Sequence, residues 1–267
     1  MSEWESGDVP TTGGRLHYHR TGAGRPPVLL LHGFSDNGLC WTRVATALQD
    51  RYDLIMPDAR GHGESDPPGD DDSPKLRADD VAAFVTALGL GQVAVIGHSM
   101  GGSSAALLAA EHPETVACAV LEDPGWRDGG PRVATADRAR SMREMQATPV
   151  EEIIRQGRKN QPGWDEVEFP AWAESKRQLS PLVYERSTTL QQRPWREVAA
   201  RIQAPTLLLT ADTSRGAIVD EKNAEEAVKL LAKGRTTRIT GAGHNIRREN
   251  FPDFLSAVTG FLGEVYA

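Results

Sequence analysis

The sequence predicts an α/β fold in which helices cover both faces of a mostly parallel sheet. Short, nearly continuous apolar runs rich in β-branched residues alternate with longer segments of helical spacing, as expected for parallel strands buried on both faces. The chain has 267 residues, which is enough for one such domain with an insertion. Hydrophobic residues make up 39% and charged residues 25%, a balance typical of globular rather than disordered chains.

The expected elements alternate along the chain. Residues 15–19 suit an antiparallel strand at the sheet edge, and buried strands are expected at 28–31, 54–56, 93–96, 116–121 and 206–209. Helices are expected between them at 41–48, 78–88 and 100–112. A last strand-like run, 236–239, precedes a C-terminal helix. Strands separated by helices in this way favour parallel pairing.

The pattern breaks between residues 125 and 197, which are rich in charge, proline and tryptophan. Helical fragments occur here at 138–145, 150–155 and 171–177. We therefore predict a core formed by residues 1–124 and 198–267, with a helical cap at 125–197. Tryptophan combines a large apolar ring with one donor, so a place in a substrate-pocket wall is one interpretation, and a role in holding the cap together is the other. Four of the six tryptophans lie in this insertion: Trp126, Trp164, Trp172 and Trp195.

The segment Gly97-His98-Ser99-Met100-Gly101 follows a predicted strand and opens a predicted helix. A sharp strand-to-helix turn strains the backbone at its apex, and glycines on either side avoid collisions there. Ser99 would project its hydroxyl above the sheet as a nucleophile. The amide of Met100 would lie at the helix N-terminus, which favours negative charge.

The predicted general base is His244, in Gly243-His244-Asn245 after the last strand-like run. An imidazole on a late loop can reach the serine and accept its proton near neutral pH. The acid that orients it is expected at the carboxyl end of a strand. Three carboxylates qualify, and we rank Asp123 first, Asp212 second and Glu122 third.

The chain resembles the α/β-hydrolase superfamily over nearly its whole length. The resemblance is carried by Leu-His-Gly-Phe at 31–34, Asp-Ala-Arg-Gly-His-Gly-Glu-Ser at 58–65, the glycine-flanked serine at 97–102, and Gly-His at 243–244. It implies an eight-stranded sheet with the cap after the sixth strand. It also implies an oxyanion hole formed by the backbone amides of Phe34 and Met100.

Most members of this superfamily carry the acid after the seventh strand, a position that here holds Ser214. Haloalkane dehalogenases, coelenterazine luciferases and zearalenone lactonases carry it after the sixth strand, which corresponds to Asp123. Relatives that remove halides or open epoxides use an aspartate nucleophile, whereas position 99 is serine. The resemblance therefore implies a serine esterase or lactonase with a catalytic triad.

These observations predict hydrolysis of a carboxylic ester or lactone of a small, largely apolar or aromatic molecule through an acyl-enzyme. No cofactor and no metal are expected. Two alternatives use the same fold: a lyase or carbon–carbon bond hydrolase with the same triad, and a non-catalytic small-molecule receptor.

The formal net charge is −7 and no block of Lys or Arg occurs, so neither nucleic acid nor a membrane surface is an expected partner. Residues 1–12 do not resemble a signal peptide, and a cytoplasmic location is expected. The two cysteines, Cys40 and Cys118, lie in apolar surroundings and are expected to be buried free thiols. A homo-oligomer is compatible with the sequence.

Overall fold

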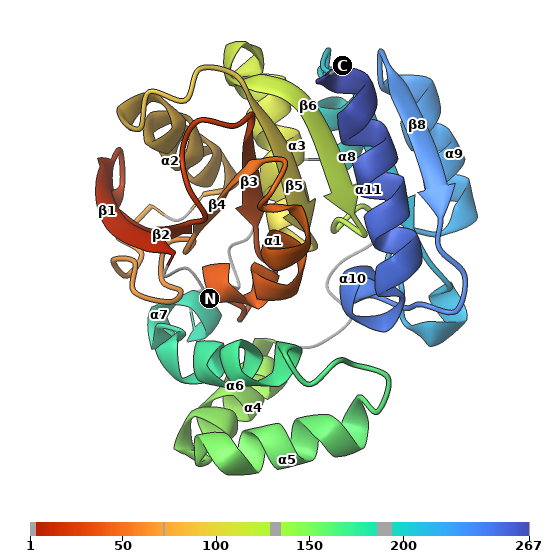
Figure 1. Ribbon diagram of the computed structural model, residues 1–267. Helices are drawn as coiled ribbons and strands as arrows, with labels where there is room; N and C mark the ends of the chain where they lie inside the picture. Colours follow the sequence, from red (N-terminus) through yellow and green to blue (C-terminus); the bar gives the residue numbers. More distant parts are fainter. Residues whose placement is uncertain (1–3, 72, 129–134, 186–193, 267) are drawn as a thin grey trace.

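The computed structural model describes residues 4–71, 73–128, 135–185 and 194–266 (Figure 1). Its eight strands form one sheet in the order β1-β2-β4-β3-β5-β6-β7-β8. The pairs β1–β2 and β2–β4 are antiparallel, and all later neighbours are parallel. The predicted fold class is confirmed. The strands are β1 Glu5–Thr11, β2 Gly14–Arg20, β3 Pro27–Leu31, β4 Asp53–Pro57, β5 Val93–His98, β6 Val116–Glu122, β7 Thr206–Thr210 and β8 Gly234–Arg238.

The sheet edge differs from the prediction. Residues 15–19 belong to β2, which pairs on both sides, and the edge strand is β1. Only Val9 of β1 is buried, so the strand lacks the apolar alternation that identifies a half-buried strand. The chain reverses after Thr11, and this turn pairs all seven residues of β1 with β2. The pairing therefore does not depend on a hydrophobic pattern in β1.

Helices cover both faces of the sheet. Leu29 and Leu31 of β3 point into a core that is completed by α2, α3, α8 and α9, whereas Val28 and Leu30 point into a second core under α1 and α11. This alternation is the period-two geometry of a strand buried on both sides. The helices on these faces are α1 Thr42–Leu48, α2 Pro74–Ala87, α3 Met100–Glu111, α8 Trp195–Ala199, α9 Glu221–Leu230 and α11 Phe251–Val265; short helical turns are η1 Gly38–Trp41, η2 Pro113–Thr115, η4 Thr213–Arg215 and α10 Ile246–Glu249.

The described residues between β6 and β7 form the helices α4 Thr135–Ala147, α5 Val150–Asn160, α6 Glu168–Gln178, α7 Pro181–Glu185 and α8. Figure 1 shows α4 to α7 grouped together beyond one end of the sheet. In contrast, α8 packs into the core with α3 and α9, and the predicted boundary at residue 197 falls inside it. The division into core and cap domains stays a prediction.

Among the described residues, every helix falls short of the length and apolar character needed to cross a lipid bilayer. Cys40 and Cys118 are both buried and free, as predicted, and burial raises the pKa of Cys118 to about 12. Neither thiol therefore has the low pKa of a reactive cysteine.

Candidate active site

Ser99 occupies the turn between β5 and α3. Its backbone has φ 53° and ψ −111°, a region that L-residues rarely adopt and that is found where function requires a sharp turn. The amide of Ser99 donates a hydrogen bond of 2.9 Å to the carbonyl of Glu122, which ties the turn to β6. A Cβ atom at Gly97 would lie 2.2 Å from the Gly101 carbonyl oxygen, and one at Gly101 would lie 2.1 Å from that of Leu31. Both glycines are therefore required for the turn to close.

The structure brings the three predicted triad residues together. His244 lies in the loop after β8, and its Nε2 atom is 3.0 Å from the Ser99 hydroxyl. Its Nδ1 atom is 2.6 Å from Oδ2 of Asp123. A carboxylate only accepts hydrogen bonds, so Nδ1 carries the proton and Nε2 is free to accept that of the serine hydroxyl.

Asp123 lies just after β6, with φ 39°, and its side chain is fully buried. The amides of Ile218 and Val219 donate hydrogen bonds of 2.8 to 3.0 Å to the two carboxylate oxygens. These donors fix the carboxylate plane and compensate for its removal from water. Asp123 is thus held in the position from which it contacts the imidazole.

The other carboxylates considered as the acid do not contact His244. Asp212 accepts hydrogen bonds from the Gly241 amide and the Arg238 guanidinium, so it supports the loop that carries His244. Glu122 is fully buried and bound by Arg247. Ser214 is exposed in η4.

His98, which precedes the nucleophile in the chain, contacts the backbone of the predicted base His244. Its Nε2 atom donates a hydrogen bond of 3.0 Å to the backbone carbonyl of His244, and the two rings lie 4.8 Å apart between centroids. Burial, reinforced by the charge of Arg247, holds the pKa of His98 well below its ordinary value. A neutral His98 therefore fixes the backbone of His244 without adding charge next to it. Sequence reasoning gave this residue no role.

The two predicted oxyanion amides belong to neighbouring segments. Phe34 follows β3 and Met100 begins α3, and neither amide donates a hydrogen bond to a described acceptor. The loop of Phe34 is anchored by His32, whose Nδ1 donates to the Gly33 carbonyl while its Nε2 accepts from the Ala59 amide. Two unpaired amides beside the serine fit the oxyanion prediction, which remains a prediction.

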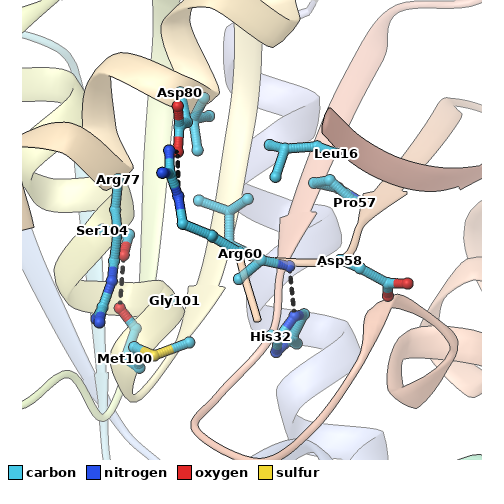
Figure 2. Close-up of a pocket in the computed structure, with 13 residues that line it drawn as sticks. Leu16, His32, Pro57, Asp58, Arg60, Arg77, Asp80, Met100, Gly101 and Ser104 are labelled. Carbon is cyan, nitrogen blue, oxygen red and sulfur yellow. Dashed lines mark hydrogen bonds and ion pairs between the residues drawn. The ribbon is translucent and has the colours of Figure 1, made fainter. Parts of the chain in front are cut away.

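A cavity adjoins the serine turn (Figure 2). Leu16, Leu31, Arg60, Asp80 and Met100 are among its lining residues, and a buried ion pair between Arg60 and Asp80 forms part of its wall. Ser99 and His244 are not in the lining. This cavity therefore lies beside the reacting groups rather than around them.

The four tryptophans predicted for a substrate pocket pack in two pairs. Trp126 and Trp195 stack with centroids 5.3 Å apart and belong to the core cluster under α3, α8 and α9. Trp164 and Trp172 meet edge to face at 5.8 Å where α5 and α6 pack together. Trp126 and Trp195 are buried in this cluster, and a place for them in a substrate pocket stays a prediction. Trp164 lies in the connection between α5 and α6, and Trp172 lies in α6, so their contact joins these two helices.

Sequence reasoning also missed a network of buried charges beside the site. Asp36 Oδ2 accepts from Arg247 at 3.3 Å and from Arg248 at 3.1 Å, and its Oδ1 accepts from Lys176 at 3.0 Å. Arg247 and Arg248 also pair with Glu122 and Glu168. Because Lys176 also donates to the Ser35 carbonyl at 2.8 Å, the network ties α6 to the loop that carries Phe34.

Lys176→Met tests this network. The change keeps an apolar side chain of similar length but leaves Oδ1 of Asp36 without its buried partner, and it leaves the Ser35 carbonyl with the Ser175 hydroxyl as its side-chain donor. We expect the free energy of unfolding to fall by about 3 kcal/mol, since breaking one member of a buried pair is costly. Lys75→Met, which removes an exposed pair with Asp79, is the control and should cost less than about 1 kcal/mol. Equal losses in urea denaturation would contradict the account.

Three buried histidines predict a pH dependence of stability. Burial lowers the pKa of His32, His62 and His98 below the ordinary value of 6.5. As pH falls through 6.5 these imidazoles take up protons in the unfolded chain but stay neutral in the folded one. The free energy of unfolding therefore falls below pH 6.5, by up to about 1.4 kcal/mol per pH unit for each histidine.

His62→Asn isolates one of these contributions. The asparagine amide can replace Nδ1 as donor to the Arg60 carbonyl, so the hydrogen bond is kept while the titrating group is lost. Denaturation measured between pH 6.5 and pH 5.5 should give a shallower slope for the variant than for the wild type. Identical slopes would show that His62 does not resist protonation in the fold.

Comparison with known proteins agrees with this architecture. Residues 26–166 match the family model for the alpha/beta hydrolase fold, and the chain belongs to this family. N-formylmaleamate deformylase of Pseudomonas putida is 26% identical, covering 96% of this chain and 96% of that protein. The crystal structure of a deformylase from Pseudomonas putida S16 superimposes with a TM-score of 0.81 at 24% identity, covering 95% of this chain and all of that one. The family match shows that the chain has the alpha/beta hydrolase fold, and the two deformylases are full-length proteins to which it is similar.

Other matches are more local. An uncharacterized protein of Mycobacterium tuberculosis is 35% identical over 113 residues, which are 42% of this chain and 33% of that protein. The chain thus spans about a third of that mycobacterial relative. This stretch of similarity supports the family and not a particular reaction.

Proposed function

We propose that the protein is a serine hydrolase that cleaves a carboxylic ester or lactone of a small, largely apolar or aromatic molecule. The observation that supports this most strongly is a pair of hydrogen bonds centred on His244. One joins it to Ser99 at 3.0 Å, and the other joins it to Asp123 at 2.6 Å. A serine activated by a histidine that is itself oriented by a buried carboxylate is the arrangement that nucleophilic acyl transfer requires. Helices from residues 125–197 would act as the cap over the substrate.

The proposed reaction has two halves. Ser99 attacks the carbonyl carbon while its proton passes to Nε2 of His244, and the amides of Phe34 and Met100 stabilise the oxyanion. The C–O bond breaks, the alkoxide leaves with the proton from His244, and an acyl-enzyme remains. Water then attacks the acyl carbon and gives a proton to His244. The bond between this carbon and Oγ of Ser99 breaks, His244 returns the proton to Oγ, and the carboxylic acid is released. Each oxyanion donor contributes roughly 3 to 4 kcal/mol in comparable sites.

A second candidate is hydrolysis of an amide bond. The observation that favours it is the relative that covers the full chain, which is named as a deformylase of N-formylmaleamate. The same triad serves both reactions, with an amine leaving in place of an alcohol. A lyase or carbon–carbon bond hydrolase, and a receptor without turnover, remain the further alternatives.

A substrate panel in H₂¹⁸O separates these candidates. The panel contains p-nitrophenyl acetate and butyrate, an aromatic lactone and an N-formyl amide, with product masses recorded. Ester hydrolysis through an acyl-enzyme places one ¹⁸O in the carboxylic acid product. Turnover of the amide alone would favour the second candidate, a product without ¹⁸O would favour a lyase, and binding without turnover would favour a receptor.

A further inference from the structure

Arg138 in α4 lies next to the predicted oxyanion loop. Its guanidinium carbon is 5.1 Å from the centroid of the Phe34 ring, and its side chain is half-buried. Phe34 in turn packs against a small cluster formed by residues of α4 and α7 and by Leu179, which follows α6. Phe34, whose amide stabilises the oxyanion in the proposed mechanism, thus also contacts the guanidinium of Arg138 in α4.

The charge of Arg138 has no counterion among the described residues, where it makes neither an ion pair nor a hydrogen bond. Its neighbours in α4 differ in this respect, because Arg140 pairs with Asp137 at 2.8 Å and Arg143 pairs with Glu185 at 3.0 Å. In the sequence, the segments that adjoin α4 and α7, residues 129–134 and 186–193, contain no Asp or Glu. The aromatic face of Phe34 compensates only weakly, by about 0.5 to 1 kcal/mol.

A half-buried guanidinium of this kind presents a planar set of donors that matches a carboxylate in two parallel hydrogen bonds. We propose that Arg138 binds a carboxylate on the acyl part of the substrate. The substrate class is then a half-ester, or a lactone with a free carboxylate, in which a short carbon chain separates the acid from the scissile carbonyl. This inference rests on the proposed function, since it assigns a binding site to the same acyl group.

The test compares an anionic and a neutral ester with the same leaving group. kcat/KM is measured for p-nitrophenyl hydrogen glutarate and for p-nitrophenyl butyrate with the wild type, Arg138→Gln and Arg140→Gln. Loss of a charge-assisted hydrogen bond predicts that Arg138→Gln lowers kcat/KM for the glutarate by about 10- to 100-fold. The butyrate value should be unchanged within error. Arg140→Gln, which removes an exposed paired charge in the same helix, should change neither.

The outcomes separate the two proposals. If the wild type hydrolyses butyrate but Arg138→Gln lowers both rates equally or neither, the assignment of Arg138 is wrong and the proposed function stands. If the wild type hydrolyses neither ester and no other acyl substrate of the panel, the proposed function fails and the assignment fails with it. Arg138→Lys adds a further check, because a point charge should restore only part of the preference for glutarate.

Discussion

Ser99→Ala should lower kcat for p-nitrophenyl butyrate roughly a million-fold, the loss seen when the nucleophile of a serine triad is removed. The variant has no oxygen to attack the carbonyl, so His244 has no hydroxyl to deprotonate. What remains is the slow attack of water, assisted by the oxyanion amides and by binding. The measurement is the rate of p-nitrophenolate release under saturating ester.

The matched control for this variant is Ser104→Ala. Ser104 lies in the second turn of α3, and its hydroxyl donates to the Met100 carbonyl at 3.0 Å. Because this bond stays within the helix, its removal should leave kcat close to that of the wild type. An active Ser99→Ala variant would show that another group is the nucleophile.

Asp123→Asn should lower kcat by about ten-thousand-fold with little change in fold. The asparagine oxygen, in the place of Oδ1, can still accept from the amides of Ile218 and Val219, and its NH₂ group then takes the place of Oδ2 next to Nδ1 of His244. The imidazole must then carry its proton on Nε2, the atom that should accept the serine proton. The variant also loses the negative charge that stabilises the imidazolium.

Asp212→Asn provides the comparison, because Asp212 is the carboxylate ranked second from the sequence. It loses an ion pair with the exposed Arg238, which is worth at most about 1 kcal/mol, and keeps an acceptor for the Gly241 amide. Turnover should therefore stay near that of the wild type. The reverse order of effects would mean that the acid has been assigned to the wrong residue.

The parts of the site that depend on local sequence could be predicted. The glycines at 97 and 101 indicate a strained turn, and the serine between them follows a strongly apolar strand. The acid was ranked but not settled from residues alone, because its place depends on amides about 95 residues further along the chain. Neither Ile218 nor Val219 carries a signal for this role, since both act through the backbone.

The buried charges and the packed tryptophans could not be predicted for a different reason. Asp36, Glu122, Lys176 and Arg247 lie far apart in sequence, and only the folded chain brings them into contact. Trp126 and Trp195 lie in a polar insertion, yet they stack in the core. Helix α9 was also missed, although the Asp220 side chain that accepts from the Asn223 amide is an ordinary N-cap signal.

The central claim is that Ser99 is the nucleophile and forms a covalent intermediate. Incubation with a fluorophosphonate, followed by digestion and mass spectrometry, tests it directly. The account predicts one adduct per chain, on the peptide that contains Ser99, formed much more slowly in His244→Ala. A protein that stays unlabelled, or that is labelled at another serine while Ser99 remains free, would contradict it.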